Sequence, residues 1–176
     1  MRIISGTHKG KRINPPKNLP VRPTTDFAKE GLFNILNNKV YFDEITVLDL
    51  FAGTGNISFE FASRQAKQIT SVDLNYQCTE FIRKTAKESS YEMLRPIKSN
   101  VFNFLTGTKN KFDIIFADPP YDMEEIEKLP VLIFDKQLLN ENGIFILEHS
   151  RSHSFEEHPR FSEHRKYGNV NFTFFK

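Results

Sequence analysis

The sequence of 176 residues contains a single cysteine, Cys78, and no long apolar run. A lone cysteine excludes an internal disulfide and the usual structural zinc sites, which need several thiolates. No stretch approaches the roughly 18 apolar residues of a membrane span, and residues 1–6 lack the apolar core of a signal peptide. The length corresponds to roughly one domain. We therefore expect a cytoplasmic protein without a membrane partner.

Acidic side chains are absent from residues 1–25, which contain six lysines and arginines. The rest of the chain carries 18 basic and 22 acidic side chains, so the net charge of +2 hides a basic arm on a mildly acidic body. Such an arm fits a polyanionic partner whose phosphates it would contact. It fits a solvated flexible tail equally well, and charge alone leaves both interpretations open.

The basic arm is predicted to begin with a hairpin and to continue as a loop. Ile3-Ile4 and Arg12-Ile13 flank residues 6–10, in which two glycines can supply the positive φ of a tight connection. Four prolines between residues 15 and 23 predict an extended segment. Thr24-Thr25-Asp26 then offers a helix cap. An apolar stripe at helical spacing follows and comprises Phe27, Ala28, Gly31, Leu32, Ile35 and Leu36.

From residue 45 onward, short strands alternate with helices. Strands are predicted over residues 45–50, 68–73, 94–99, 112–117 and 143–148, and helices around residues 57–62, 78–86 and 126–139, the last interrupted near Pro130. This alternation predicts right-handed βαβ units and a parallel sheet covered on both faces. Residues 161–167 and 170–176 flank Gly168-Asn169 and predict a final hairpin. The fold class is therefore α/β with seven strands, of which the last is antiparallel.

A glycine-containing loop follows the first of these strands. The segment Asp49-Leu50-Phe51-Ala52-Gly53-Thr54-Gly55 places two glycines between a buried strand and a helix, where backbone can approach a ligand closely. The next strand ends in Asp73, an acid that can accept hydrogen bonds from two ribose hydroxyls. The dinucleotide fingerprint lacks its third glycine, which argues against NAD. The run instead resembles the nucleoside-binding loop of methyltransferases that use S-adenosylmethionine (SAM).

A second motif, Asp118-Pro119-Pro120-Tyr121, directly follows the strand predicted over residues 112–117. Ligands of open α/β sheets sit at the C-terminal ends of the strands, and the two prolines stiffen the turn. The Asp118 carboxylate and the Pro119 carbonyl would then accept hydrogen bonds from one exocyclic amino group, while Tyr121 stacks on the base. The motif predicts methyl transfer to the amino nitrogen of a purine.

With both motifs, the chain resembles the RsmD family, bacterial methyltransferases that modify the N2 of a guanine in small-subunit (16S) ribosomal RNA. The resemblance covers nearly the whole chain, and its most specific part is Arg22-Pro23-Thr24-Thr25-Asp26. It implies a Rossmann-like class I SAM-dependent methyltransferase fold over residues 24–176. It also implies a small basic hairpin extension and an RNA-contacting arm over residues 1–23.

The resemblance also implies a role for each matched residue. The catalytic residues would be Asp118, Pro119, Pro120 and Tyr121. The residues that bind SAM, and its product S-adenosylhomocysteine, would be Asp49, Phe51, Gly53, Gly55, Asp73, Asn100 and Val101. The residues that contact RNA would be Lys9, Lys11, Arg12, Arg22 and Thr24. No metal is implied. The expected partner is 16S ribosomal RNA, within an assembling ribosomal subunit.

Two other functions fit the same motifs. The amino group could be the N6 of adenine in RNA or DNA, although 176 residues leave little room for a DNA-recognition domain. The chain could also be a non-catalytic RNA-binding assembly factor of this fold. One position stays open as well, because Glu148 is either structural or part of the pocket. Gln65 stands where a helix-ending glycine is common, and we expect it to adopt a left-handed conformation there.

Overall fold

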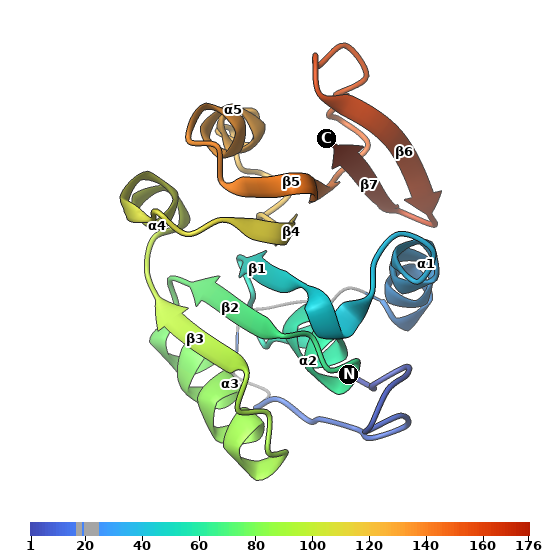
Figure 1. The fold of residues 1–176 in the computed structure, drawn as a ribbon, viewed down its shortest axis with the longest axis vertical. Coiled ribbons are helices and arrows are strands. Elements are labelled where there is room, and N and C mark those ends of the chain that lie inside the picture. Colours follow the sequence, from blue (N-terminus) through green and yellow to red (C-terminus); the bar gives the residue numbers. More distant parts are fainter. Residues whose placement is uncertain (17–18, 20–24) are drawn as a thin grey trace.

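The computed structural model describes residues 1–16, 19 and 25–176. A seven-stranded sheet runs through its centre in the order β3-β2-β1-β4-β5-β7-β6 (Figure 1). The strands are β1 (Thr46–Leu50), β2 (Gln68–Asp73), β3 (Leu94–Lys98), β4 (Phe112–Ala117), β5 (Leu139–His149), β6 (Phe161–Tyr167) and β7 (Val170–Phe175). β1 to β5 pair in parallel, whereas β7 pairs antiparallel with both β5 and β6. The expected α/β class and antiparallel strand are confirmed.

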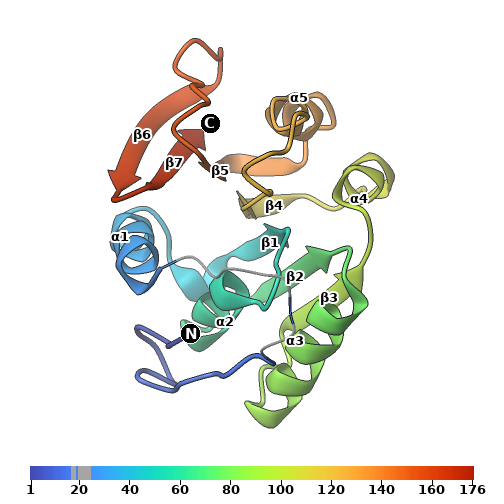
Figure 2. The same cartoon turned by 180° about the vertical axis from the view of Figure 1, so that it is seen from behind.

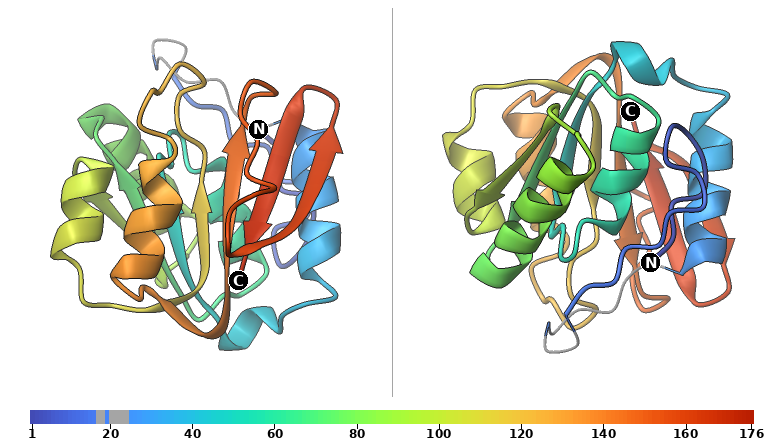
Figure 3. Two further views of the ribbon diagram at one scale, coloured as in Figure 1. Left: turned by 90° about the horizontal axis from the view of Figure 1, so that it is seen from above. Right: turned by 90° about the horizontal axis from the view of Figure 1, so that it is seen from below.

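Helices cover the two faces of the sheet. They are α1 (Asp26–Leu36), α2 (Asn56–Ser63), α3 (Tyr76–Glu88), α4 (Val101–Gly107) and α5 (Lys128–Asp135), with a short 3-10 turn at Phe42–Glu44. One apolar cluster packs α1, α2 and α3 against one face, and a second packs α4 and α5 against the other. Figure 3 shows the two layers from above and below. Within the described part of the chain, no helix is long and apolar enough to cross a membrane.

The structure corrects three sequence predictions. α4 was not expected, because seven residues are too few to establish a helical stripe. α5 ends at Asp135 instead of residue 139, and Pro130 lies in its first turn, where proline needs no helix-internal hydrogen bond. β5 begins at Leu139 instead of residue 143, because an irregularity between Phe112 and Ile114 lets the pairing with β4 restart.

The N-terminal segment is antiparallel, but it forms an isolated bridge between Arg2 and Arg12 and no strands. Ile3 and Ile13 are buried in the core beneath α1 and α2. Figure 2 shows the segment, in dark blue, beside these helices. Gly6 has φ +85°, and a Cβ there would lie 2.0 Å from the Ser63 carbonyl oxygen. Only glycine therefore allows the segment to approach the end of α2 so closely.

A buried ion pair joins the N-terminal segment to α1 and α2. Lys29 of α1 lies 3.6 Å from Glu60 of α2, and both side chains are fully buried. Lys29 also donates to the Arg2 carbonyl at 2.7 Å and to Asn56 at 2.8 Å. The Glu60 carboxylate accepts from the backbone N–H groups of Ile4 and Ser5. Burial lowers the pKa of Lys29, although the Glu60 carboxylate opposes that shift.

Candidate active site

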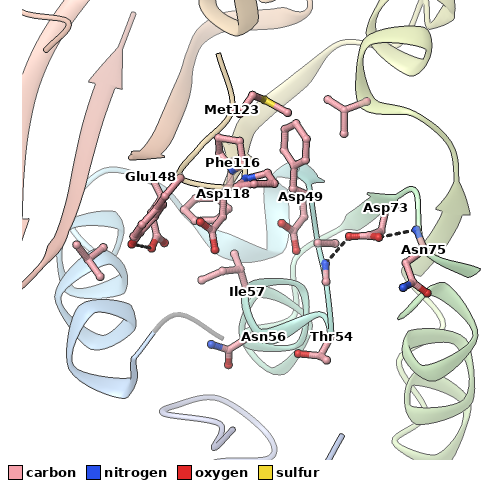
Figure 4. Close-up of a pocket in the computed structure, with 18 of the residues that line it drawn as sticks. Asp49, Thr54, Asn56, Ile57, Asp73, Asn75, Phe116, Asp118, Met123 and Glu148 are labelled. Carbon is pink, nitrogen blue, oxygen red and sulfur yellow. Dashed lines mark hydrogen bonds between the residues drawn. The ribbon is translucent and has the colours of Figure 1, made fainter. Parts of the chain in front are cut away.

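A cavity of about 1230 Å³ opens at the C-terminal ends of the central strands. Four carboxyl groups lie along it in a row, in the order of their strands (Figure 4). These residues are Glu148 of β5, Asp118 after β4, Asp49 of β1 and Asp73 of β2. Because these strands pair in parallel, their four C-terminal ends lie on the same side of the sheet. The two predicted motifs therefore meet in one site.

The glycine loop is held at the cavity by Asp73. Its two carboxylate oxygens accept hydrogen bonds from the backbone N–H groups of Gly53 and Asn75, each at 2.8 Å. Phe51 has a backbone φ of +58°, a conformation that residues other than glycine rarely adopt. Strain of this kind is typical of backbone that a binding site must shape. The loop and Asp73 thus form one preorganised wall.

Gly55 differs from the other predicted SAM residues, because it does not belong to the cavity lining. It caps α2 with φ +79°, and a Cβ there would lie 2.9 Å from Ile82 Cγ1. The role of Gly55 is to let α2 begin directly after the loop and pack against α3.

Asp49 is fully buried, and burial raises the pKa of its carboxyl from 3.8 to about 7. The hydroxyl of Ser58, in α2, donates to this carboxyl and also lies 2.6 Å from the Ser71 hydroxyl. The hydrogen bonds from Ser58 to the Asp49 carboxyl oppose the shift in its pKa. A buried carboxyl beside an open cavity is well suited to stabilise a positively charged ligand.

Asn100 begins α4, and its side-chain oxygen accepts from the N–H groups of Phe102 and Asn103. Because that oxygen is used by the cap, the group that Asn100 offers to a ligand is its amide N–H donor. Val101 lines the cavity beside it and is 4% exposed. Both residues belong to the lining, where the chain passes from β3 into α4.

The Asp118-Pro119-Pro120-Tyr121 motif lines the cavity throughout. The N–H of Asp118 donates to the Leu50 carbonyl at 3.3 Å, which ties the start of the turn to β1. Tyr121 is 49% exposed, and its hydroxyl donates to Glu148 Oε1 at 3.3 Å. Glu148 is 2% exposed and belongs to the lining, so the structure settles its position in favour of the pocket.

An aromatic pair, Phe27 and Tyr167, lines the cavity, and the helical pattern predicted the wrong environment for Phe27. Phe27 was expected on the buried stripe of α1, but it is 67% exposed and lines the cavity. Its ring meets Tyr167 edge-on, with 5.7 Å between centroids. Tyr167 reaches this position because it packs directly over Gly31. The one available signal for Phe27 was its place beside the Arg-Pro-Thr-Thr-Asp motif.

Of the predicted RNA-contacting residues, the three that the structure describes, Lys9, Lys11 and Arg12, do not line the cavity. Lys11 donates to the Ser89 hydroxyl at 2.8 Å, at the C-terminal end of α3. Thr7 and His8, next to Lys9, bind Ser63 at the C-terminal end of α2, whereas the cavity meets the start of that helix. Lys9 and Lys11 therefore lie at the far end of the molecule from the site. Arg22 and Thr24 lie outside the described residues.

Comparisons with known proteins agree with this geometry. A family model described as Conserved hypothetical protein 95 matches residues 1–176. The chain belongs to this family. It is 34% identical to the ribosomal RNA small subunit methyltransferase D of Buchnera aphidicola, over 86% of this chain and 79% of that protein. The resemblance to the RsmD family is thereby confirmed.

Solved structures confirm the fold of this RsmD family member. The yhhF protein of Escherichia coli, described as a methyltransferase, is 28% identical, with a TM-score of 0.84 over 99% of this chain and 96% of its own. A Streptococcus mutans protein described as a SAM-dependent methyltransferase shares the fold at 18% identity, with a TM-score of 0.67 over 83% of this chain and 48% of its own. Among residues 1–16, 19 and 25–176, no group of His, Cys, Asp or Glu could hold a metal ion.

Proposed function

We propose that this RsmD family member transfers a methyl group from SAM to the exocyclic N2 of a guanine in 16S ribosomal RNA. One observation carries the proposal: the Asp-Pro-Pro-Tyr motif and the glycine loop with Asp73 line the same cavity. At about 1230 Å³ the cavity exceeds the usual size of a small-molecule site. It has room for a nucleoside cofactor and an extruded base together.

The residues at the β1 and β2 side fit SAM. The Asp73 carboxylate can accept from ribose hydroxyls with the lone pairs that Gly53 and Asn75 leave unused. Asp49 provides negative charge for a sulfonium or an ammonium group, and Asn100 provides a donor for the adenine ring. SAM, when bound, supplies a methyl group whose bond to sulfur breaks as the bond to nitrogen forms, leaving S-adenosylhomocysteine.

The residues at the β4 side act on the base. An amino nitrogen of guanine is a poor nucleophile, because its lone pair is conjugated with the ring. Acceptors that bind both amino hydrogens draw the nitrogen toward a pyramidal shape and stabilise the positive charge that develops on it. We assign these acceptors to the Asp118 carboxylate and the Pro119 carbonyl. Asp118 orients the amino group. After methyl transfer, the nitrogen loses a proton to Asp118 or to water.

The setting of the reaction is part of the proposal. An rRNA substrate agrees with the names of the relatives, and we place the reaction on an assembling ribosomal subunit in the cytoplasm. We assign residues 1–23 to an RNA-contacting arm and residues 24–176 to the methyltransferase domain. The charge of the arm supports this division.

The test is nucleoside mapping of ribosomal RNA from cells that lack this protein. We expect one N2-methylguanosine to disappear from 16S RNA and to return when the purified protein and SAM are added to small subunits from those cells. Loss of N6-methyladenosine instead would show that the substrate is adenine. If the methylation of the RNA is unchanged in those cells but the purified protein still binds small subunits, the result would favour an assembly factor without activity.

A further inference from the structure

Glu148 stands beside Asp118 at the edge of the sheet. β4 and β5 pair in parallel with Ala117 opposite Leu147. Asp118 follows Ala117 and Glu148 follows Leu147, so these two residues come next to each other at the ends of neighbouring strands. Neighbouring strands are about 4.8 Å apart, and Figure 4 shows the two carboxyl groups side by side. Both residues line the cavity. The site therefore presents two adjacent carboxyl groups where the base is expected.

The Glu148 side chain is held in place by its surroundings. It is 2% exposed, and its Oε1 accepts from the Tyr121 hydroxyl at 3.3 Å. Tyr121 itself belongs to the motif that faces the base. Glu148 is thus coupled to the same motif as the proposed acceptor.

The two purines differ in what they show to such a pair. Guanine presents its N1–H donor next to its 2-amino group, whereas adenine presents a bare N1 acceptor next to its 6-amino group. A carboxylate offers acceptors only. Two adjacent carboxylates therefore complement guanine. They would disfavour adenine. With the 6-amino group of adenine bound at one carboxylate, its N1 lone pair would face the other carboxylate, and two acceptors repel each other.

We propose that Glu148 accepts the N1–H of the target guanine while Asp118 holds its 2-amino group, and that this contact selects guanine over adenine. The inference rests on the proposed function, because it assumes that the base enters beside Asp118. It assigns Glu148 a role in specificity that the Asp-Pro-Pro-Tyr motif cannot supply, since that motif recognises only an amino group.

The experiment uses small-subunit RNA with guanine or 2,6-diaminopurine at the target position. The analogue keeps the 2-amino group, replaces the N1–H by a bare nitrogen, and carries a 6-amino group in place of the O6 of guanine. We expect the wild-type single-turnover rate on the analogue to be roughly 10- to 100-fold below that on guanine, the cost of an unpaired buried acceptor. Equal rates on both substrates would overturn the inference, while N2-methylguanosine formation would leave the proposed function intact.

The variant Glu148→Gln gives a second, independent measurement. The glutamine amide can donate to the bare nitrogen of 2,6-diaminopurine, so the ratio of analogue to guanine rates should rise at least tenfold. Glu141→Gln, an exposed change at the other end of β5, should leave the ratio as in the wild type. An unchanged ratio in a Glu148→Gln protein that still binds SAM would also overturn the inference. Absence of any N2-methylguanosine with the wild type would overturn the proposed function itself.

Discussion

The carboxylate of Asp73, at the end of β2, binds the backbone N–H of Gly53 in the loop that follows β1, with 2.8 Å between the two atoms. Its other oxygen binds the N–H of Asn75 at the same distance. One side chain therefore fixes the loop and the start of the next helix while it faces the cavity. This arrangement links the shape of the wall formed by the glycine loop to a single residue.

We expect Asp73→Asn to weaken SAM binding by about 10- to 100-fold. An asparagine oxygen can satisfy one of the two amides, but its NH₂ group would face the other, and the loss of a hydrogen bond to a charged group costs about 1.5–3 kcal/mol. Calorimetric titration with SAM measures the change. Glu92→Gln, an exposed substitution, is the control. An unchanged dissociation constant in Asp73→Asn would remove Asp73 from the SAM site.

Asp118→Ala should lower kcat by about 10²- to 10³-fold, by analogy with the removal of one preorganised hydrogen-bonding group from an active site. SAM affinity should change much less, because Asp118 lies on the β4 side of the cavity. Asp118→Asn should keep much of the activity, since its amide oxygen still accepts. Asp122→Ala changes an exposed carboxyl in the same loop and serves as the control. Wild-type turnover in Asp118→Ala would disprove the assigned mechanism.

Replacing Lys9, Lys11 and Arg12 with alanine should flatten the salt dependence of RNA binding. Each contact with a phosphate of single-stranded RNA contributes about 0.7 to the slope of log K against log salt, so the slope should fall by about 2. RNA titrations at several salt concentrations measure it. A triple variant at Lys109, Lys111 and Lys136, all exposed, controls for net charge. The same slope in the wild type and the first variant would place the RNA surface elsewhere and leave these three side chains as solvated surface charges.

The stability of the protein should fall as pH rises toward about 7 because of Asp49. Burial raises the pKa of this carboxyl to about 7, so the folded state binds its proton more tightly than the unfolded state does. The resulting stabilisation is fully present below the unfolded pKa near 3.9 and is lost as pH rises through about 7. Asp49→Asn cannot ionise and should lose less stability between pH 5 and pH 8.

Thermal unfolding of both proteins at the two pH values tests the role of Asp49. Burial lowers the pKa of His149, which acts in the opposite sense, but this contribution is common to both proteins and cancels in the comparison. Parallel pH dependence in the wild type and Asp49→Asn would show that Asp49 does not titrate in this range.

Gln65→Gly should stabilise the protein by about 1 kcal/mol. Gln65 follows α2 with φ +66°, and a left-handed conformation costs a residue with a Cβ roughly 1–2 kcal/mol. Its N–H binds the Ala62 carbonyl and the N–H of Ala66 binds the Phe61 carbonyl, the pattern in which glycine is preferred. Urea unfolding measures the gain. Gln65→Ala keeps the strain and should match the wild type, so an equal gain in both variants would assign the effect to the lost side chain.

The sequence by itself determined the order of the strands along the chain, the helices other than α4, and the place of both motifs. Apolar runs such as the one before Asp49 must be buried on both faces, and that requirement predicts a parallel sheet whose strand ends share one edge. Asp49, Asp73 and Asp118 could be assigned to one site for this reason. Gln65 could be expected in a left-handed conformation because of its place after a helix, and it is.

Only the tertiary structure decided which side chains meet across the chain. Tyr121 and Glu148 are 27 residues apart, and their contact depends on how β4 and β5 pair. Phe27 meets Tyr167, from the final hairpin, at the cavity because Tyr167 packs over Gly31. Lys9 and Lys11 lie far from the cavity because the N-terminal segment follows α2 to its end. Periodicity describes one element at a time, whereas these positions result from the packing of several elements together.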